Sequence, residues 1–185
     1  MEKKDLKPAG VFKYFEEICQ VPRPSKKEEK MIAYLKAFGA KHNLETKVDE
    51  AGNVLIKKPA TPGKENLQTV VLQSHIDMVC EKNNDVQHDF LTDPIETEID
   101  GEWLKAKGTT LGADNGIGVA TELAILADDS IEHGPLECLF TVDEETGLTG
   151  AFALKEGFMS GDILLNLDSE DEGEIFIGCA GGIDS

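Results

Sequence analysis

The chain has 185 residues, which is enough to bury the core of one domain. Its 36 acidic residues outnumber the 18 basic ones and give a formal net charge of −18, which argues against the basic surface that a nucleic-acid partner requires. The charged N-terminus MEKKDLKPAG resembles no secretory signal, and no apolar run approaches membrane-spanning length. We therefore expect a cytoplasmic protein with no membrane association.

Two helices and a hairpin are predicted in the first third of the chain. Apolar residues recur at helical spacing over residues 8–21, which predicts the first helix. Ser25 and Glu28 have the spacing of a capping box, which predicts that the second helix opens there. Residues 45–58 alternate between apolar and polar on both sides of the turn sequence EAGN, and this pattern predicts a β-hairpin.

Four apolar runs further along the chain have the continuous character of strands buried on both faces. They cover residues 67–73, 135–142, 162–168 and 172–182. The segments between them predict a short strand at 102–107, a glycine-rich loop at 108–116, and helices at 116–129 and 147–157. This alternation predicts an α/β fold with a mixed, largely parallel sheet that helices cover on both faces.

Acidic and imidazole side chains follow the predicted strands where each strand ends. One further acid lies in the glycine-rich loop that enters a helix. The residues in question are His75, Asp77, Asp114, Glu144, Glu145 and Asp168. Because binding sites in open α/β sheets form outside the carboxyl ends of the strands, we expect these side chains to meet at one edge.

Several carboxylates at one edge repel one another unless a cation lies between them. A mixture of imidazole and carboxylate ligands suits zinc, manganese or cobalt better than calcium. Glu144 and Glu145 are adjacent, so in an extended segment their side chains point in opposite directions. One of them could then bind metal while the other takes a proton from an activated water.

Each of these residues also has a commoner interpretation on its own. A histidine after a strand is usually a loop residue, an acidic pair is usually a solvated turn, and Asp114 before a helix is more often an N-cap. The coincidence of all of them at one predicted edge favours a metal site. A non-catalytic binding module on the same scaffold remains the alternative.

Four segments resemble the zinc-dependent metallopeptidase family that includes aminoacylase, carboxypeptidase G and the dipeptidases. They are SHIDMV, GTTLGADNGIG, DEETG and LDSEDEGEIFIGCAGGID, and the resemblance extends over nearly the whole chain, most closely to the dipeptidase branch. It implies that His75 and Asp168 bind one zinc, that Asp114 bridges two, and that Glu145 binds the second. It also implies a cis peptide bond after Asp114.

The remaining roles that the resemblance implies concern the reaction. Asp77 would orient the imidazole of His75, and Glu144 would be the general base for a metal-bridging hydroxide that attacks the peptide bond. The cofactors would be two Zn²⁺ ions, with Mn²⁺ or Co²⁺ possible. The substrate would be a dipeptide, including Xaa-His. A related amidohydrolase, such as a deacylase or carboxypeptidase, stays open because substrate choice lies largely in a lid domain of the family.

The family's last zinc ligand is a histidine near the C-terminus of a much longer chain. We therefore expect residues 1–185 to be the N-terminal part of the catalytic domain, without the lid domain and the C-terminal catalytic segment. The second zinc would then lack a ligand, because His42, His88 and His133 are not convincing replacements. The resemblance also implies that the full-length protein forms a homodimer through the missing lid.

Overall fold

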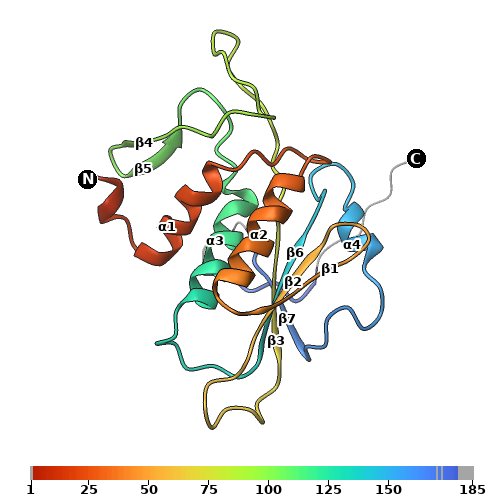
Figure 1. Cartoon of the computed structure of the whole chain (residues 1–185). Coiled ribbons are helices and arrows are strands. Elements are labelled where there is room, and N and C mark those ends of the chain that lie inside the picture. Colours follow the sequence, from red (N-terminus) through yellow and green to blue (C-terminus); the bar gives the residue numbers. More distant parts are fainter. Residues whose placement is uncertain (1, 170, 172, 179–185) are drawn as a thin grey trace.

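The structure, a computed structural model, describes residues 2–169, 171 and 173–178. Figure 1 shows helices gathered on one side of a central sheet and a separate small hairpin beside α1. The elements in chain order are η1 (Lys3–Asp5), α1 (Ala9–Cys19), α2 (Glu29–Lys41), β1 (Glu45–Val48), β2 (Val54–Lys58), β3 (Val70–His75), β4 (Thr97–Asp100), β5 (Trp103–Ala106), α3 (Ala113–Ala127), β6 (Leu136–Thr141), α4 (Thr149–Ala153) and β7 (Ile163–Asn166).

The central sheet has the strand order β1-β2-β6-β3-β7. β1 and β2 form the predicted hairpin, and β2 pairs antiparallel with β6. β6, β3 and β7 run parallel, with His75 opposite Thr141 and Gln73 opposite Asn166. The predicted mixed α/β sheet is therefore confirmed, and the carboxyl ends of its three parallel strands lie at one edge.

The main core lies between the sheet and helices α1, α2 and α3, which cover one of its faces (Figure 1). The helices present apolar side chains at helical spacing, and the strands present alternate residues to the same layer. The buried side chains here include Phe15, Ile18, Leu35, Ile56, Leu72, Leu123 and Phe140. Within the described part of the chain, no helix is long and apolar enough to cross a bilayer.

The opposite face of the sheet has a thinner cover than the sequence predicts. Leu55, Val71 and Leu139 pack against side chains of the segment that follows α4, namely Leu154, Phe158 and Met159. α4 itself is a helix of five residues, shorter than the predicted helix at 147–157. Phe152 on α4 is 82% exposed and Leu164 on β7 is 48% exposed. The predicted cover is therefore extensive on one face of the sheet and thin on the other.

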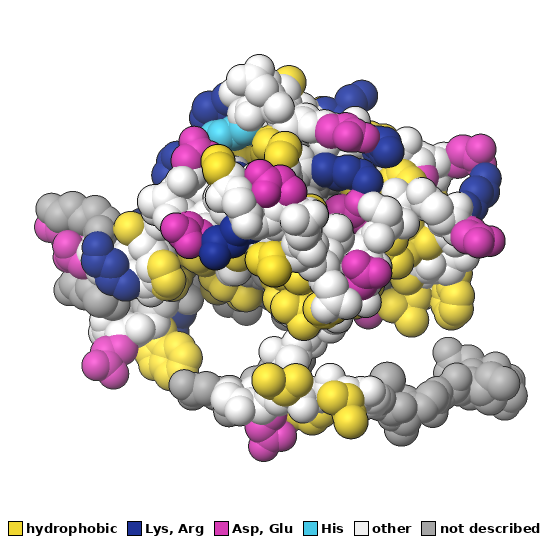
Figure 2. Space-filling view, turned by 90° about the horizontal axis from the view of Figure 1, so that it is seen from below, with side chains coloured by type: hydrophobic (Ala, Val, Ile, Leu, Met, Phe, Trp, Pro, Cys, Tyr) yellow, Lys and Arg dark blue, Asp and Glu magenta, His cyan; other side chains and the backbone are white. Residues whose placement is uncertain are grey.

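The two C-terminal strand predictions need correction. β7 forms, but among the described strands it lies at the edge of the sheet with β3 as its partner, and all four of its residues are exposed rather than buried. The described residues 173–178 form no strand; Ile175 and Ile177 are almost fully exposed. Figure 2 shows the apolar side chains of this segment standing away from the body of the protein. Apolar character alone therefore did not determine burial here. Residues 172 and 179–182 of the predicted strand lie outside the described part of the chain.

The predicted capping box at Ser25 is wrong. α2 begins at Glu29, and its N-cap residue, Glu28, makes no side-chain cap. The Ser25 hydroxyl donates instead to Oδ2 of Asp77 at 2.7 Å, and Oε1 of Glu28 accepts the backbone N–H of Asp143 at 3.0 Å. Both side chains are therefore used in tertiary contacts beside the carboxyl ends of the parallel strands. The sequence pattern also did not predict β4, which pairs with the predicted strand β5.

Candidate metal site

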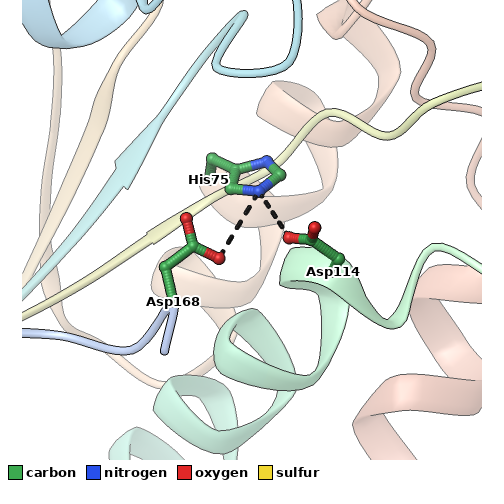
Figure 3. A group of neighbouring side chains, drawn as sticks. All are labelled: His75, Asp114 and Asp168. Carbon is green, nitrogen blue, oxygen red and sulfur yellow. Dashed lines mark hydrogen bonds and ion pairs between the residues drawn. The ribbon is translucent and has the colours of Figure 1, made fainter. Parts of the chain in front are cut away.

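His75 lies at the carboxyl end of β3, and its side chain is buried. Its Nδ1 is 3.1 Å from Oδ1 of Asp77, and its Nε2 is 2.9 Å from Oδ1 of Asp114. The same Nε2 is 3.8 Å from Oδ1 of Asp168 and 4.0 Å from Oε2 of Glu144. Figure 3 shows Asp114 and Asp168 pointing from different elements toward this one ring nitrogen. Parallel strand ends therefore bring together side chains that are far apart in sequence.

Asp77 is fully buried and connects the imidazole to the turn after β6. Its carboxylate accepts the backbone N–H of Glu144 at 3.0 Å and that of Glu145 at 3.2 Å. Burial raises the pKa of Asp77, but the hydrogen bonds from His75, the Glu144 backbone and Ser25 outweigh this effect and lower the pKa to about 2. An ionised Asp77 therefore orients His75 through Nδ1 and fixes the backbone of both glutamates.

Asp114 occupies the first turn of α3 in a non-helical conformation. The helix opens after Gly112, whose φ of 70° lies in the left-handed region that glycine adopts without strain. The peptide bond between Asp114 and Asn115 is cis, as the resemblance implies. Asp114 is therefore not the N-cap, and its carboxylate faces Nε2 of His75 instead.

The acidic groups of this cluster affect one another's ionisation. The pKa of Asp168 is raised to about 6, first by burial and then by the negative charges of Asp114 and Glu144, although His75 opposes these effects. The pKa of Glu145 is raised by burial and then by Asp114. Burial lowers the pKa of His75, but hydrogen bonds with Asp77 and Asp114 outweigh this effect and raise it to about 9. Negative charge is therefore concentrated here beyond what one imidazole balances.

The donor atoms fit a divalent cation. One ligand atom each from His75, Asp114 and Asp168 lies within 4.8 Å of the other two. An imidazole nitrogen with two carboxylate oxygens is the donor set that zinc and similar ions bind. The Glu145 backbone is fixed beside this group, but its carboxylate is not one of the three clustered ligands.

A second group of acids nearby has a structural explanation. Glu28, Asp77 and Asp143 also approach within 4.8 Å and are all buried. Their oxygens accept hydrogen bonds from protein donors: Glu28 from two backbone N–H groups, and Asp143 from the hydroxyls of Thr146 and Thr149. This second group therefore holds the turn after β6 in place.

Three side chains near the site were not anticipated from the sequence: Arg23, Ser25 in its observed role, and Glu122. Arg23 is buried and bonds to the backbone just after β3, and Glu122 is fully buried and bonds to Ser74 within β3. The sequence offered one indication that Arg23 has a special position, because it is the single arginine among the 18 basic residues of the chain. Glu122 offered no such signal, because an acid within an amphipathic helix is usually on the solvated side.

Known proteins are similar to this chain over most of its length. Residues 71–179 match the sequence profile of Peptidase family M20/M25/M40. The chain is 54% identical over 183 residues to the cytosol non-specific dipeptidase of Escherichia coli K12, covering 99% of this chain and 38% of that protein.

Solved structures give the same result. The aminoacylhistidine dipeptidase from Vibrio alginolyticus superposes with a TM-score of 0.94 at 56% identity, covering 97% of this chain and 36% of that one. The aminopeptidase PepT from Bacillus cereus superposes with a TM-score of 0.74 at 26% identity, covering 88% of this chain and 43% of that one. The chain thus spans less than half the length of these relatives. The predicted resemblance is confirmed, and the chain belongs to peptidase family M20/M25/M40.

Proposed function

We propose that this chain is the N-terminal, metal-binding part of the catalytic domain of a dizinc dipeptidase. The observation that carries the proposal is the convergence of His75, Asp114 and Asp168, from two strand ends and one helix start, on a single cluster of ligand atoms. The chain spans 38% of its dipeptidase relative, which supports the view that a lid domain, a C-terminal catalytic segment and a further histidine ligand belong to the remainder. The complete protein would be cytoplasmic and would dimerise through the lid.

The ligands divide between two ions. His75 and Asp168 would hold the first, Asp114 would contact both, and Glu145 would hold the second together with the histidine from the remainder. Zinc is the preferred ion for this donor set, with manganese or cobalt as substitutes. When bound, the ions would lower the pKa of a water molecule and polarise the carbonyl of the scissile peptide bond.

The protein side chains would manage the protons. Asp77 holds Nδ1 of His75, so Nε2 remains available to the cluster. Glu144 lies at the rim of the cluster, 4.0 Å from Nε2, and its backbone is fixed by Asp77. In our proposal its carboxylate takes the proton of the attacking water and delivers it to the departing amine.

The substrate class separates this proposal from a related amidohydrolase. The complete protein, supplied with Zn²⁺, is expected to hydrolyse unblocked dipeptides such as Xaa-His much faster than the same amino acids acylated at nitrogen. A panel of both kinds of substrate, compared by kcat/KM, measures this difference. A preference for the acylated amino acids would indicate a deacylase, and release of a C-terminal residue from longer peptides would indicate a carboxypeptidase.

Metal binding separates the proposal from a non-catalytic module. Zn²⁺ at about 100 times its Kd is expected to stabilise the 185-residue chain by about 2.7 kcal/mol, which corresponds to a rise in Tm of roughly 5–10 °C. Asp168→Asn should reduce this rise, because it removes a charged ligand. Asp162→Asn, at the opposite end of β7, is the matched control and should keep it. A Tm that Zn²⁺ leaves unchanged in the unsubstituted chain would support the non-catalytic alternative.

A further inference from the structure

Arg23 is the single arginine of the chain, and its side chain is 2% exposed. It lies between α1 and α2, in a segment that runs alongside the end of β3 and forms a parallel bridge between Pro24 and Met78. Burying a guanidinium is costly unless its N–H groups are satisfied. The position of Arg23 therefore requires specific partners, and the structure provides them.

The partners of Arg23 are backbone carbonyls on two separate segments. Nη1 donates to the carbonyl of Ile76 at 3.3 Å and to that of Asp77 at 3.0 Å, and Nη2 donates to the carbonyl of Gly112 at 2.6 Å. The first two carbonyls directly follow His75 in the chain. The third lies two residues before Asp114. One guanidinium therefore joins the segment that carries the imidazole to the segment that carries the carboxylate facing it.

The surrounding backbone closes tightly on this guanidinium. A Cβ atom added at Gly112 would lie 2.5 Å from Nη2 of Arg23, and one added at Gly116 would lie 2.7 Å from it. The start of α3 therefore approaches the arginine as closely as only glycine permits. Because the guanidinium is a rigid planar fork, its three hydrogen bonds define the distance between the two segments.

We propose that Arg23 is a positioning residue of the metal site, which holds His75 and Asp114 at the separation that a shared cation requires. This inference rests on the proposed function, because it assigns Arg23 to the same pair of ligands. Among the described residues, the hydrogen bonds of Arg23 go to backbone carbonyls and not to a ligand side chain, so in this role it acts through the backbone on either side of the ligands.

The test compares the affinity of the 185-residue chain for Zn²⁺, measured by competition with a chelator, among four proteins. Arg23→Met should bind Zn²⁺ about 10–100-fold more weakly than the unsubstituted chain, the usual effect of removing a partner that orients metal ligands. Arg23→Lys should also lose at least about tenfold, because one ammonium cannot span three carbonyls in fixed directions. The visible absorption of bound Co²⁺ should change in both variants, which reports altered ligand geometry.

Lys58→Met is the matched control. Lys58 is also a buried cation that donates to backbone carbonyls, those of Ile125 in α3 and of Asp128 just after it, but at the end of the helix away from the site. Its loss should leave Zn²⁺ affinity within about twofold, because distant sites act independently. A Zn²⁺ affinity that Arg23→Lys retains would overturn the proposal, as would an equal loss in Lys58→Met.

Amide hydrogen exchange in the metal-free chain distinguishes a failure of this inference from a failure of the proposed function. If the unsubstituted chain binds no Zn²⁺, the metal site itself is refuted. Arg23→Lys should still speed exchange at Gly116, whose N–H bonds to the carbonyl of Gly112, more than Lys58→Met does. Equal exchange in these two variants would then overturn the positioning role. If Arg23→Met does not fold, the measurements on Arg23→Lys are sufficient for the test.

Discussion

Glu144→Gln in the complete protein is expected to lower kcat about 10²–10⁴-fold, the usual contribution of a general base, while zinc content stays unchanged. Glutamine preserves the shape of the side chain but cannot accept the proton. The backbone N–H of residue 144 would still donate to Asp77, so the turn should keep its place. Steady-state kinetics with a dipeptide, together with metal analysis of the same sample, measure both quantities.

Glu145→Gln is the matched control for this experiment, because the adjacent residue has the same side chain and the same backbone anchor on Asp77. Its carboxylate is a proposed ligand, so the loss of activity should come with a loss of bound zinc. A Glu144→Gln variant with unchanged kcat would show that the base is another group. If that variant lost zinc as well as activity, Glu144 would be a ligand.

The second large effect concerns Glu122, which is fully buried on α3 between two strands of the sheet. The Ser74 hydroxyl donates to its Oε1 at 2.6 Å, and its Oε2 has no hydrogen-bond partner among the described residues. Burial raises the pKa of Glu122 to about 8, although the hydrogen bond from Ser74 and the neighbouring Cys138 thiol oppose the shift. At neutral pH the folded protein therefore holds this group protonated.

Glu122→Gln is expected to make the chain more stable at neutral and alkaline pH. In the wild type the unfolded chain releases the proton of Glu122 from about pH 4.5 upward, whereas the folded chain keeps it until about pH 8. The unfolded state then binds fewer protons, so the free energy of unfolding falls across this window by about 1.4 kcal/mol per pH unit. The Glu122→Gln variant has no proton to release at this position, so its free energy of unfolding should not fall in this way. It should exceed that of the wild type by roughly 3 kcal/mol near pH 7.

Urea unfolding of both proteins in metal-free buffer at pH 5, 6, 7 and 8 measures this difference. The gap in unfolding free energy should be small at pH 5 and should widen toward pH 8. Glu132→Gln, at an acid whose side chain is 77% exposed, is the control and should show no such widening. A gap between wild type and Glu122→Gln that stays constant from pH 5 to pH 8 would contradict an ionisation at this position.

The clustering of the candidate site residues was largely predictable because it depends on strand direction. Once β3, β6 and β7 are recognised as parallel strands, the residues after their carboxyl ends must share one edge, and His75 and Asp168 meet there. Strand direction alone could not assign Asp114 to the site, since a residue in its loop could equally have been a helix cap. The resemblance identified it, and the structure places it 2.9 Å from His75.

The failures have a common physical cause: local patterns do not reveal tertiary partners. The spacing of Ser25 and Glu28 suits a capping box, but both side chains bond to residues distant in sequence. The apolar run of β7 has the composition of an interior strand, yet it lies at the edge of the sheet. Arg23 and Glu122 are ionisable residues in the interior, and their burial depends on carbonyls and hydroxyls that only the folded chain assembles.

The edge position of β7 has a consequence for how the site and the fold support each other. Asp168 follows a strand with a single described neighbour, whereas His75 ends an interior strand and Asp114 begins a packed helix. A cation held by all three would act as a cross-link, closing chain loops that are open in the unfolded polypeptide. Because the unfolded chain does not hold the three ligands together, the binding free energy of the ion would add to the stability of the folded chain, and the ion would fasten the edge of the sheet to its interior.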